Sequence, residues 1–226
     1  MTTPPFQRAR SAESKRRRAQ DLIDAARVLA TEQGVAGVTL TAIAQSAGVH
    51  HSAVRRYFDS HKEVLLHLAA EGWIRWSQAV CEALRGERAE ADRLADVLAT
   101  TLAADPLFCD LLANVPLHLE HAVDVDRVID FKQRTRAPIA AMVEAIAAAA
   151  PSLDARAASD VVLAADALAA TLWQVTHPAQ GLASAQLRDP DLAAISVTDF
   201  LGTLRRLLAA TCMGLAAPQS VTEGPE

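Results

Sequence analysis

The side chains best suited to specific chemistry in this chain lie close together near its N-terminus. His51, Ser52, Arg55 and Arg56 fall on the outward side of a helix whose Val54 faces inward. An arginine can donate two hydrogen bonds to O6 and N7 of guanine, and a serine or histidine can reach base edges or phosphates. This polar face is therefore predicted to contact double-stranded DNA.

Three short helical segments must hold that face outward. Hydrophobic spacing predicts helices over residues 14–33, 40–47 and 52–58. Gly48 stands at the tight connection between the second and third helices, and Thr39 is placed to cap the second. Two short helices joined by such a turn form a helix-turn-helix, whose second helix enters the major groove of DNA.

Further residues of this N-terminal head can contact the phosphate backbone. Thr39 and Thr41 can donate hydrogen bonds from the start of the second helix. The basic run Arg16, Arg17 and Arg18 can reach phosphates or an adjacent minor groove. The sequence thus predicts both base contacts and backbone contacts from one small domain.

Plainer interpretations of the same residues stay open. The basic run can be a solvated helix start, and the two arginines of the third helix can be surface charges. His50 and His51 can be turn or capping residues, and adjacent histidines rarely chelate one metal ion.

Charge is distributed unevenly along the 226 residues. Residues 1–62 carry +5 and residues 63–226 carry −10, which gives the net charge of −5. A basic head on an acidic body indicates that the head meets a polyanion.

The rest of the chain is predicted to be helical as well. Ser60, followed by Glu63, forms a capping box that opens a long helix to about residue 84. Later helices are expected over 92–103, 106–113, 124–149, 154–176 and 197–213, with Pro138 kinking or splitting the third of these. Residues 177–190 are expected to be a loop with one short helical turn. No strand pattern occurs, so the fold class is all-α.

Composition excludes several classes of protein. With 51% hydrophobic residues the chain can bury a large core, which excludes intrinsic disorder. No membrane span and no secretory signal are expected, so the protein is placed in the cytoplasm, with Cys81, Cys109 and Cys212 reduced.

Catalytic and metal-binding patterns are weak. His118, Glu120 and His121 suggest a metal site, but a helix is expected to begin just after them, so they need not share a face. No catalytic triad, carboxylate pair or phosphate-binding glycine loop occurs. We expect no enzyme activity, no metal and no cofactor.

The stretch TLTAIAQSAGVHHSAVRRYFDSHKEVL carries a family resemblance. Its spacing of Thr39, Ala47-Gly48-Val49, Tyr57-Phe58 and Leu65 resembles the DNA-binding domain of the TetR family of bacterial transcriptional regulators. The resemblance covers residues 14–68. It implies an N-terminal three-helix helix-turn-helix domain and a larger helical domain for ligand binding and dimerisation.

Two positions depart from the family pattern. The family usually has a phosphate-contacting tyrosine at the position of Arg55, where an arginine can make the same contact. The family's phosphate-binding lysine falls on His61, so either protonated His61 or the next residue, Lys62, takes its place; backbone amides with Lys62 are favoured. The predicted DNA contacts are Arg16, Arg17, Arg18, Thr39, Thr41, His50, His51, Ser52, Arg55, Arg56, Tyr57, His61 and Lys62.

The resemblance also implies domain bounds and a homodimer. We expect a flexible basic arm over 1–13, the DNA-binding domain over 14–62, the body over 63–214 and a flexible tail over 215–226. Apolar stripes on the last two long helices are expected to form a four-helix bundle between two subunits. The predicted interface residues are Val161, Ala165, Leu168, Leu172, Val175, Val197, Leu201, Leu204 and Leu208.

A small molecule bound in the body is expected to move the long helix that follows the head and so release operator DNA. Few charges lie in the middle helices, which favours an apolar or neutral effector. The predicted ligand contacts, each of which can also be plain core, are Trp73, Trp76, Phe108, Cys109, Leu112, His121, Phe131, Met142, Trp173, Gln174 and His177.

Two other functions stay open. One is a helix-turn-helix activator or DNA binder without an effector, which would lack a closed cavity. The other is a helical carrier or enzyme with a vestigial head, which would have lost its basic face.

Overall fold

The computed structural model describes residues 5–121, 123–178, 180–189, 191–192 and 196–216. Every regular element within them is helical, which confirms the all-α prediction. In chain order the helices are α1 (Pro5–Gln33), the 3₁₀ turn η1 (Val35–Gly37), α2 (Leu40–Ser46), α3 (His51–Val54), α4 (His61–Ala83), α5 (Ala91–Ala103), α6 (Pro106–Asn114), the π-helical turn η2 (Val115–Leu119), α7 (Val125–Ala149), α8 (Ala155–Thr176), α9 (Gln180–Arg188) and α11 (Phe200–Ala216).

Local hydrogen bonds define the head, which comprises α1, α2 and α3. The Ala42 N–H donates to the Thr39 hydroxyl at 3.1 Å, as the capping pattern predicts. Gly48 closes α2 with φ of +65°, a left-handed conformation that glycine adopts without strain. Helix α2 packs against both α1 and α3, with Ile43 of α2 and Val54 of α3 fully buried.

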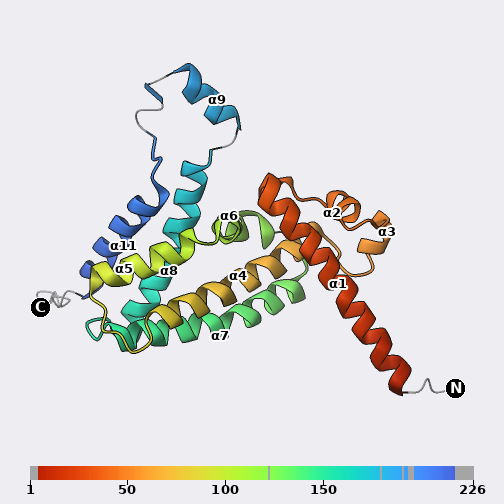
Figure 1. The fold of residues 1–226 in the computed structure, drawn as a ribbon, viewed down its shortest axis with the longest axis horizontal. Helices are drawn as coiled ribbons and strands as arrows, with labels where there is room; N and C mark the ends of the chain where they lie inside the picture. Colours follow the sequence, from red (N-terminus) through yellow and green to blue (C-terminus); the bar gives the residue numbers. More distant parts are fainter. Residues whose placement is uncertain (1–4, 122, 179, 190, 193–195, 217–226) are drawn as a thin grey trace, which may run out of the picture.

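A capping box begins α4, which joins the head to the body. The Glu63 N–H donates to the Ser60 hydroxyl at 3.2 Å, and the Glu63 carboxylate accepts from the Asp59 N–H at 2.9 Å. The helix then runs beside α7, as Figure 1 shows. Helix α8 packs against α6, α7 and α11, and α5 packs against α11. These contacts form the core of the body.

Several helix boundaries differ from the sequence prediction, three of them as follows. Helix α1 begins at Pro5, inside the segment expected to be a flexible arm, and α3 ends at Val54 instead of residue 58. Helix α11 begins at Phe200 instead of residue 197, because Asp199 caps it by accepting from the Gly202 N–H at 2.9 Å. Residues 1–4 and 217–226, the outer parts of the predicted arm and tail, lie outside the described residues.

Two elements differ in kind. Pro138 is expected to kink or split its helix; α7 continues through it as one helix, so the split is wrong. Packing against α4 holds it together, and the Ser77 hydroxyl of α4 donates to the Pro138 carbonyl at 2.7 Å. The segment expected to be a loop with one turn contains α9, a helix of 9 residues, which lies beyond the ends of α8 and α11 in Figure 1.

The predicted dimer stripes need a correction. Five of their residues are buried within a single chain, where α8 and α11 pack against the body, so a partner cannot cover them: these are Val161, Ala165, Leu172, Leu204 and Leu208. Leu168, Val197 and Leu201 are half-buried in the same core. Of the predicted set only Val175 is an exposed large apolar side chain, together with Leu163, Leu207 and Met213 on the same two helices.

Helix α8 is also long and apolar enough to cross a membrane by length and composition alone. Its contacts with α6, α7 and α11 are those of a core helix in a helical domain.

Candidate nucleic-acid interface and body cavity

The head presents its predicted base-contacting residues to solvent. Ser52, Arg55 and Arg56 are exposed, whereas Val54 between them is fully buried. Since α3 ends at Val54, the two arginines stand in the turn that follows it. Their guanidinium groups are free to hydrogen-bond to an approaching groove.

Some of the other predicted DNA contacts also stabilise the head itself. The Nδ1 atom of His50 accepts from the Ser52 N–H at 3.3 Å and lies 2.9 Å from the Ser52 hydroxyl, so the capping interpretation of His50 holds. His51 and Tyr57 are half-buried, and Tyr57 packs against the core. Thr39 and Thr41 are exposed at the start of α2.

The basic run belongs to α1, whose N-terminal part projects beyond the other helices of the head (Figure 1). Arg16, Arg17 and Arg18 are all exposed there. Arg18 lies 3.9 Å from Asp21 in an exposed pair one turn along the helix, which binds it weakly. Both the DNA-contacting and the solvated interpretation remain compatible with this placement.

The first turn of α4 resolves the alternatives at His61 and Lys62 only in part. Burial and the neighbouring Lys62 lower the pKa of His61, so its imidazole is neutral near pH 7 and lacks the charge for a strong phosphate contact. The Lys62 ammonium donates to the backbone carbonyl of His121 at 2.8 Å. This lysine therefore links the start of α4 to the segment between η2 and α7.

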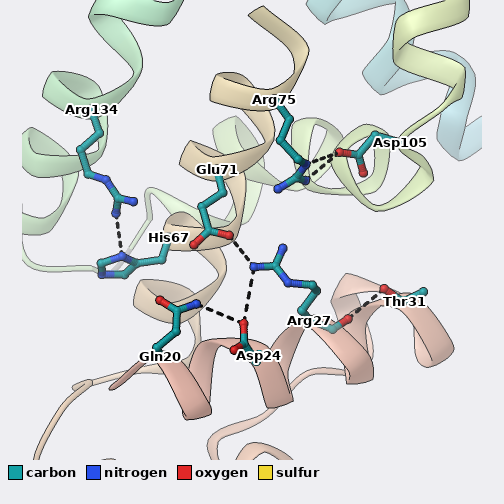
Figure 2. A network of polar contacts seen from close by, with 9 residues as sticks. All are labelled: Gln20, Asp24, Arg27, Thr31, His67, Glu71, Arg75, Asp105 and Arg134. Carbon is teal, nitrogen blue, oxygen red and sulfur yellow. Dashed lines mark hydrogen bonds and ion pairs between the residues drawn. The ribbon is translucent and has the colours of Figure 1, made fainter. Parts of the chain in front are cut away.

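Polar contacts join α4 to its neighbours along its length, as Figure 2 shows. Arg27 of α1 forms an ion pair with Glu71 of α4 and lies 3.8 Å from Asp24. Further along α4, Arg75 pairs with Asp105 at 2.7 Å. On one side of α4, the first pair thus ties it to α1 of the head, and the second ties it to the start of α6 in the body.

On the other side, α4 is tied to α7. Arg127 lies 2.9 Å from the buried Glu63 carboxylate, and the Arg134 guanidinium lies 2.6 Å from Nδ1 of His67. Burial and Arg134 both lower the pKa of His67, so its imidazole is neutral and accepts this hydrogen bond. A displacement of α7 or of the loop before it therefore acts directly on α4.

A cavity of about 360 Å³ lies in the body between α4, α6, η2, α7 and α8. Three of the predicted ligand contacts line it, namely Trp73, Leu112 and Phe131. The other lining residues are Val115, Pro116, Glu120, Lys132, Thr135, Ile139, Ser159, Val162, Leu163 and Asp166. The space has the size and largely apolar walls of a small-molecule site.

Family models match both parts of the chain. The model of bacterial regulatory proteins of the tetR family matches residues 22–68, and the model of the tetracyclin repressor-like C-terminal domain matches residues 70–219. The chain belongs to the TetR family. It is thus a helix-turn-helix regulator with a ligand-binding C-terminal domain, which is a DNA-binding class and not an enzyme class. No curated protein matches the chain.

Solved structures share this TetR fold at low sequence identity. A possible TetR family transcriptional regulator from Streptomyces coelicolor A3(2) is 22% identical, with a TM-score of 0.57, covering 87% of this chain and 98% of that one. The multidrug binding protein EbrR, complexed with imidazole, is 20% identical, with a TM-score of 0.53 and coverage of 92% and 98%. FadR from Bacillus subtilis, in complex with stearoyl-CoA, is 16% identical, with a TM-score of 0.51 and coverage of 85% and 98%.

The remaining predicted ligand contacts lie outside this cavity of the TetR body. Phe108, Cys109 and Met142 are fully buried core residues. The Cys109 thiol donates to the Leu102 carbonyl at 3.3 Å, and burial raises the pKa of the thiol to about 12, so it is unreactive. Trp76 donates from its indole N–H to the Thr101 hydroxyl at 3.0 Å and lines a different hollow.

Four predicted residues lie elsewhere on the surface. Trp173, Gln174 and His177 border a separate hollow of about 450 Å³ near the end of α1, where the Gln174 amide donates to Asp110 at 3.0 Å. His121 is exposed. The sequence prediction of one pocket thus combined residues of different sites, because helical spacing does not reveal which hollow a helix face borders.

Three charged residues of the cavity were missed. Lys132 forms an ion pair with Glu120, and Asp166 lies on the mostly apolar C-terminal part of α8. Burial raises the pKa of Asp166 to about 6. The sequence did contain one signal for Asp166, because it is the single charged residue within residues 161–176. A lone carboxylate in such a run either reaches solvent or has a specific role.

Metal binding finds no support in the described part of the chain, where no three His, Cys, Asp or Glu side chains gather closely enough to hold an ion.

Proposed function

We propose that this TetR-family regulator is a cytoplasmic repressor that binds a palindromic operator as a homodimer and is released by a small molecule with an apolar body. The observation that carries the proposal is the exposed pair Arg55 and Arg56 beside a buried Val54. A vestigial head would have no reason to keep this arrangement. The body cavity supports the ligand-responsive part, because an effector-free DNA binder needs no such space.

A homodimer gives this arrangement its specificity. Two recognition segments held one helical turn of DNA apart, roughly 34–36 Å, match the two halves of a palindrome. The exposed apolar side chains of α8 and α11, Leu163, Val175, Leu207 and Met213, supply a surface that a second subunit can cover. Symmetric pairing of these two helices makes a four-helix interface.

Release follows from contacts that α4 makes at its start and near its middle. Trp73 of α4 is a wall of the cavity, and Lys62 at the start of α4 is bonded to the His121 carbonyl beside η2. A ligand that binds more tightly when α4 is displaced shifts the population toward that state. The two heads then no longer fit successive major grooves.

Two structural relatives support an effector with an apolar body. FadR from Bacillus subtilis is in complex with stearoyl-CoA, and EbrR is described as a multidrug binding protein. The apolar cavity residues Leu112, Val115 and Ile139 suit such a body.

Binding of the purified protein to its own upstream DNA, titrated with salt, tests the proposal. Specific binding by two subunits or a multiple of two is expected, with affinity falling steeply as salt rises. Arg55→Ala and Arg56→Ala should each weaken binding, by about 1–3 kcal/mol where the arginine contacts a base. The matched control is Arg85→Ala, an exposed arginine just past the far end of α4.

The same titration separates the alternatives. Unchanged affinity in both head variants, or failure to select any duplex from a random pool, would refute operator binding through this face. Tight binding that no small molecule relieves would favour the activator or effector-free interpretation.

A further inference from the structure

The charges of the body cavity do not cancel. Glu120 and Lys132 form an ion pair with each other, which leaves Asp166. The Asp166 carboxylate makes no hydrogen bond or ion pair with any residue that the structure describes. Lys132 also attracts Asp166 from a distance and partly offsets the effect of burial on the pKa of this carboxyl. Two carboxylates thus share one ammonium group, and the described residues of the lining carry a net charge of −1.

A carboxylate in this position favours a ligand of opposite charge. Burial removes the favourable hydration free energy of an ionised group, and a nearby opposite charge compensates for that loss. The raised pKa of Asp166 reflects this loss, although most of the carboxylate is still ionised near pH 7. A protonated amine beside it would gain a charge-assisted hydrogen bond in a partly dry site.

The aromatic walls suit a cation too. The ammonium of Lys132 already lies 5.2 Å from the centroid of the Phe131 ring, so the site tolerates a positive charge over this ring. The indole of Trp73 offers the same kind of attraction to a ligand cation.

An anionic ligand fits poorly. Among the described residues that line the cavity, the one positive side chain is Lys132, which is already paired with Glu120. A carboxylate or phosphate would thus meet two acidic side chains and no free cation among the residues that line the cavity.

We propose that the cavity binds an organic cation, an amine with an apolar body, and that Asp166 is the counter-ion that selects it. This inference rests on the proposed function; it keeps the apolar body of the expected effector and replaces the expected neutral character by a positive charge. The apolar body lies against the apolar side chains of α6, η2, α7 and α8, and the ammonium group lies at Asp166.

Isothermal titration of the full-length protein with three probes of one chain length tests the charge preference. The probes are octylammonium, octanol and octanoate. Octylammonium is expected to bind at least about tenfold more tightly than octanol, the usual gain from a hydrogen bond to a charged group. Octanoate is expected to bind most weakly.

Asp166→Asn should remove the preference by bringing octylammonium and octanol to similar Kd values, while octanol still binds as it does to the parent chain. The matched control is Asp160→Asn, which makes the same charge change at an exposed position of the same helix. It should leave the preference intact. If Asp166→Asn fails to fold, the three probes measured on the parent chain still show whether the cavity prefers a cation.

Tighter binding of octanol or octanoate than of octylammonium overturns the proposal, as does binding of none of the three. An unchanged preference in Asp166→Asn overturns the assignment of the counter-ion. These outcomes are distinct from failure of the proposed function, which is measured separately by operator binding without any probe and by its relief with any effector.

Discussion

Replacing Asp166 by Asn should stabilise the protein at neutral pH. The pKa of this carboxyl is about 6 in the folded protein, against 3.8 for an ordinary aspartate. A difference of about 2 units corresponds to about 3 kcal/mol by which ionisation disfavours the folded state. Solvent at the cavity mouth reduces this to about 2 kcal/mol. Asparagine keeps the shape of the side chain without the charge.

The dependence on pH has a defined sign. Below pH 3.8 the carboxyl is protonated in both states, so its favourable contribution to folding is fully present. That contribution is lost as pH rises through about 6, because the unfolded chain releases the proton first. With the same reduction for solvent, the advantage of Asp166→Asn should therefore shrink by about 1 kcal/mol between pH 7.5 and pH 5.

Urea unfolding of both proteins at these two pH values measures the effect. Protein concentration must be fixed and ligand absent, because dimerisation and binding both add to stability. Asp160→Asn serves as the control, with an expected change within about 0.5 kcal/mol. The argument that burial disfavours the ionised carboxylate would be refuted if Asp166→Asn were less stable than the parent at pH 7.5. It would also be refuted if the gain in unfolding free energy did not depend on pH.

Packing and ion pairs give two further predictions. Gly72→Ala would place a methyl group 2.1 Å from the buried ring of Phe108, so a loss of about 1–3 kcal/mol is expected in chemical unfolding. The control is Gly214→Ala, where the added methyl group has no neighbouring atom within 4 Å, so no loss of stability is expected. Equal losses of stability in the two variants would refute the predicted clash with Phe108. Arg27→Met should cost about 1 kcal/mol by breaking a half-buried pair, and Arg18→Met less than about 0.5 kcal/mol; the reverse order would contradict the contacts drawn in Figure 2.

Features set by neighbouring residues were predictable from the sequence. The Thr39 cap, the left-handed Gly48 and the capping box of Ser60 and Glu63 each join residues three or four apart or follow from one backbone conformation. Their free energies depend little on the rest of the molecule. The helix-turn-helix and the exposed position of Arg55 and Arg56 could be read from such local patterns.

Elements that depend on distant contacts could not be predicted in this way. Pro138 is a helix breaker by its own chemistry, yet packing against α4 keeps α7 continuous. Helix α9 forms where hydrophobic spacing indicated a loop. Val161 and Leu204 belong to a stripe that suits an interface or a core equally well, and only the packing of α8 and α11 within one chain places them in the core.

The same distinction applies to the candidate sites. By itself, the sequence determined the all-α class and the DNA-contacting head, since both follow from periodicity and local hydrogen bonds. Only the tertiary structure brought Asp166 of α8, Trp73 of α4 and Phe131 of α7 to one cavity, and Lys62 to the His121 carbonyl. Residues this far apart along the chain meet only when helices pack, because packing fixes which faces adjoin. Burial by that packing also makes the charge of Asp166 costly and therefore selective.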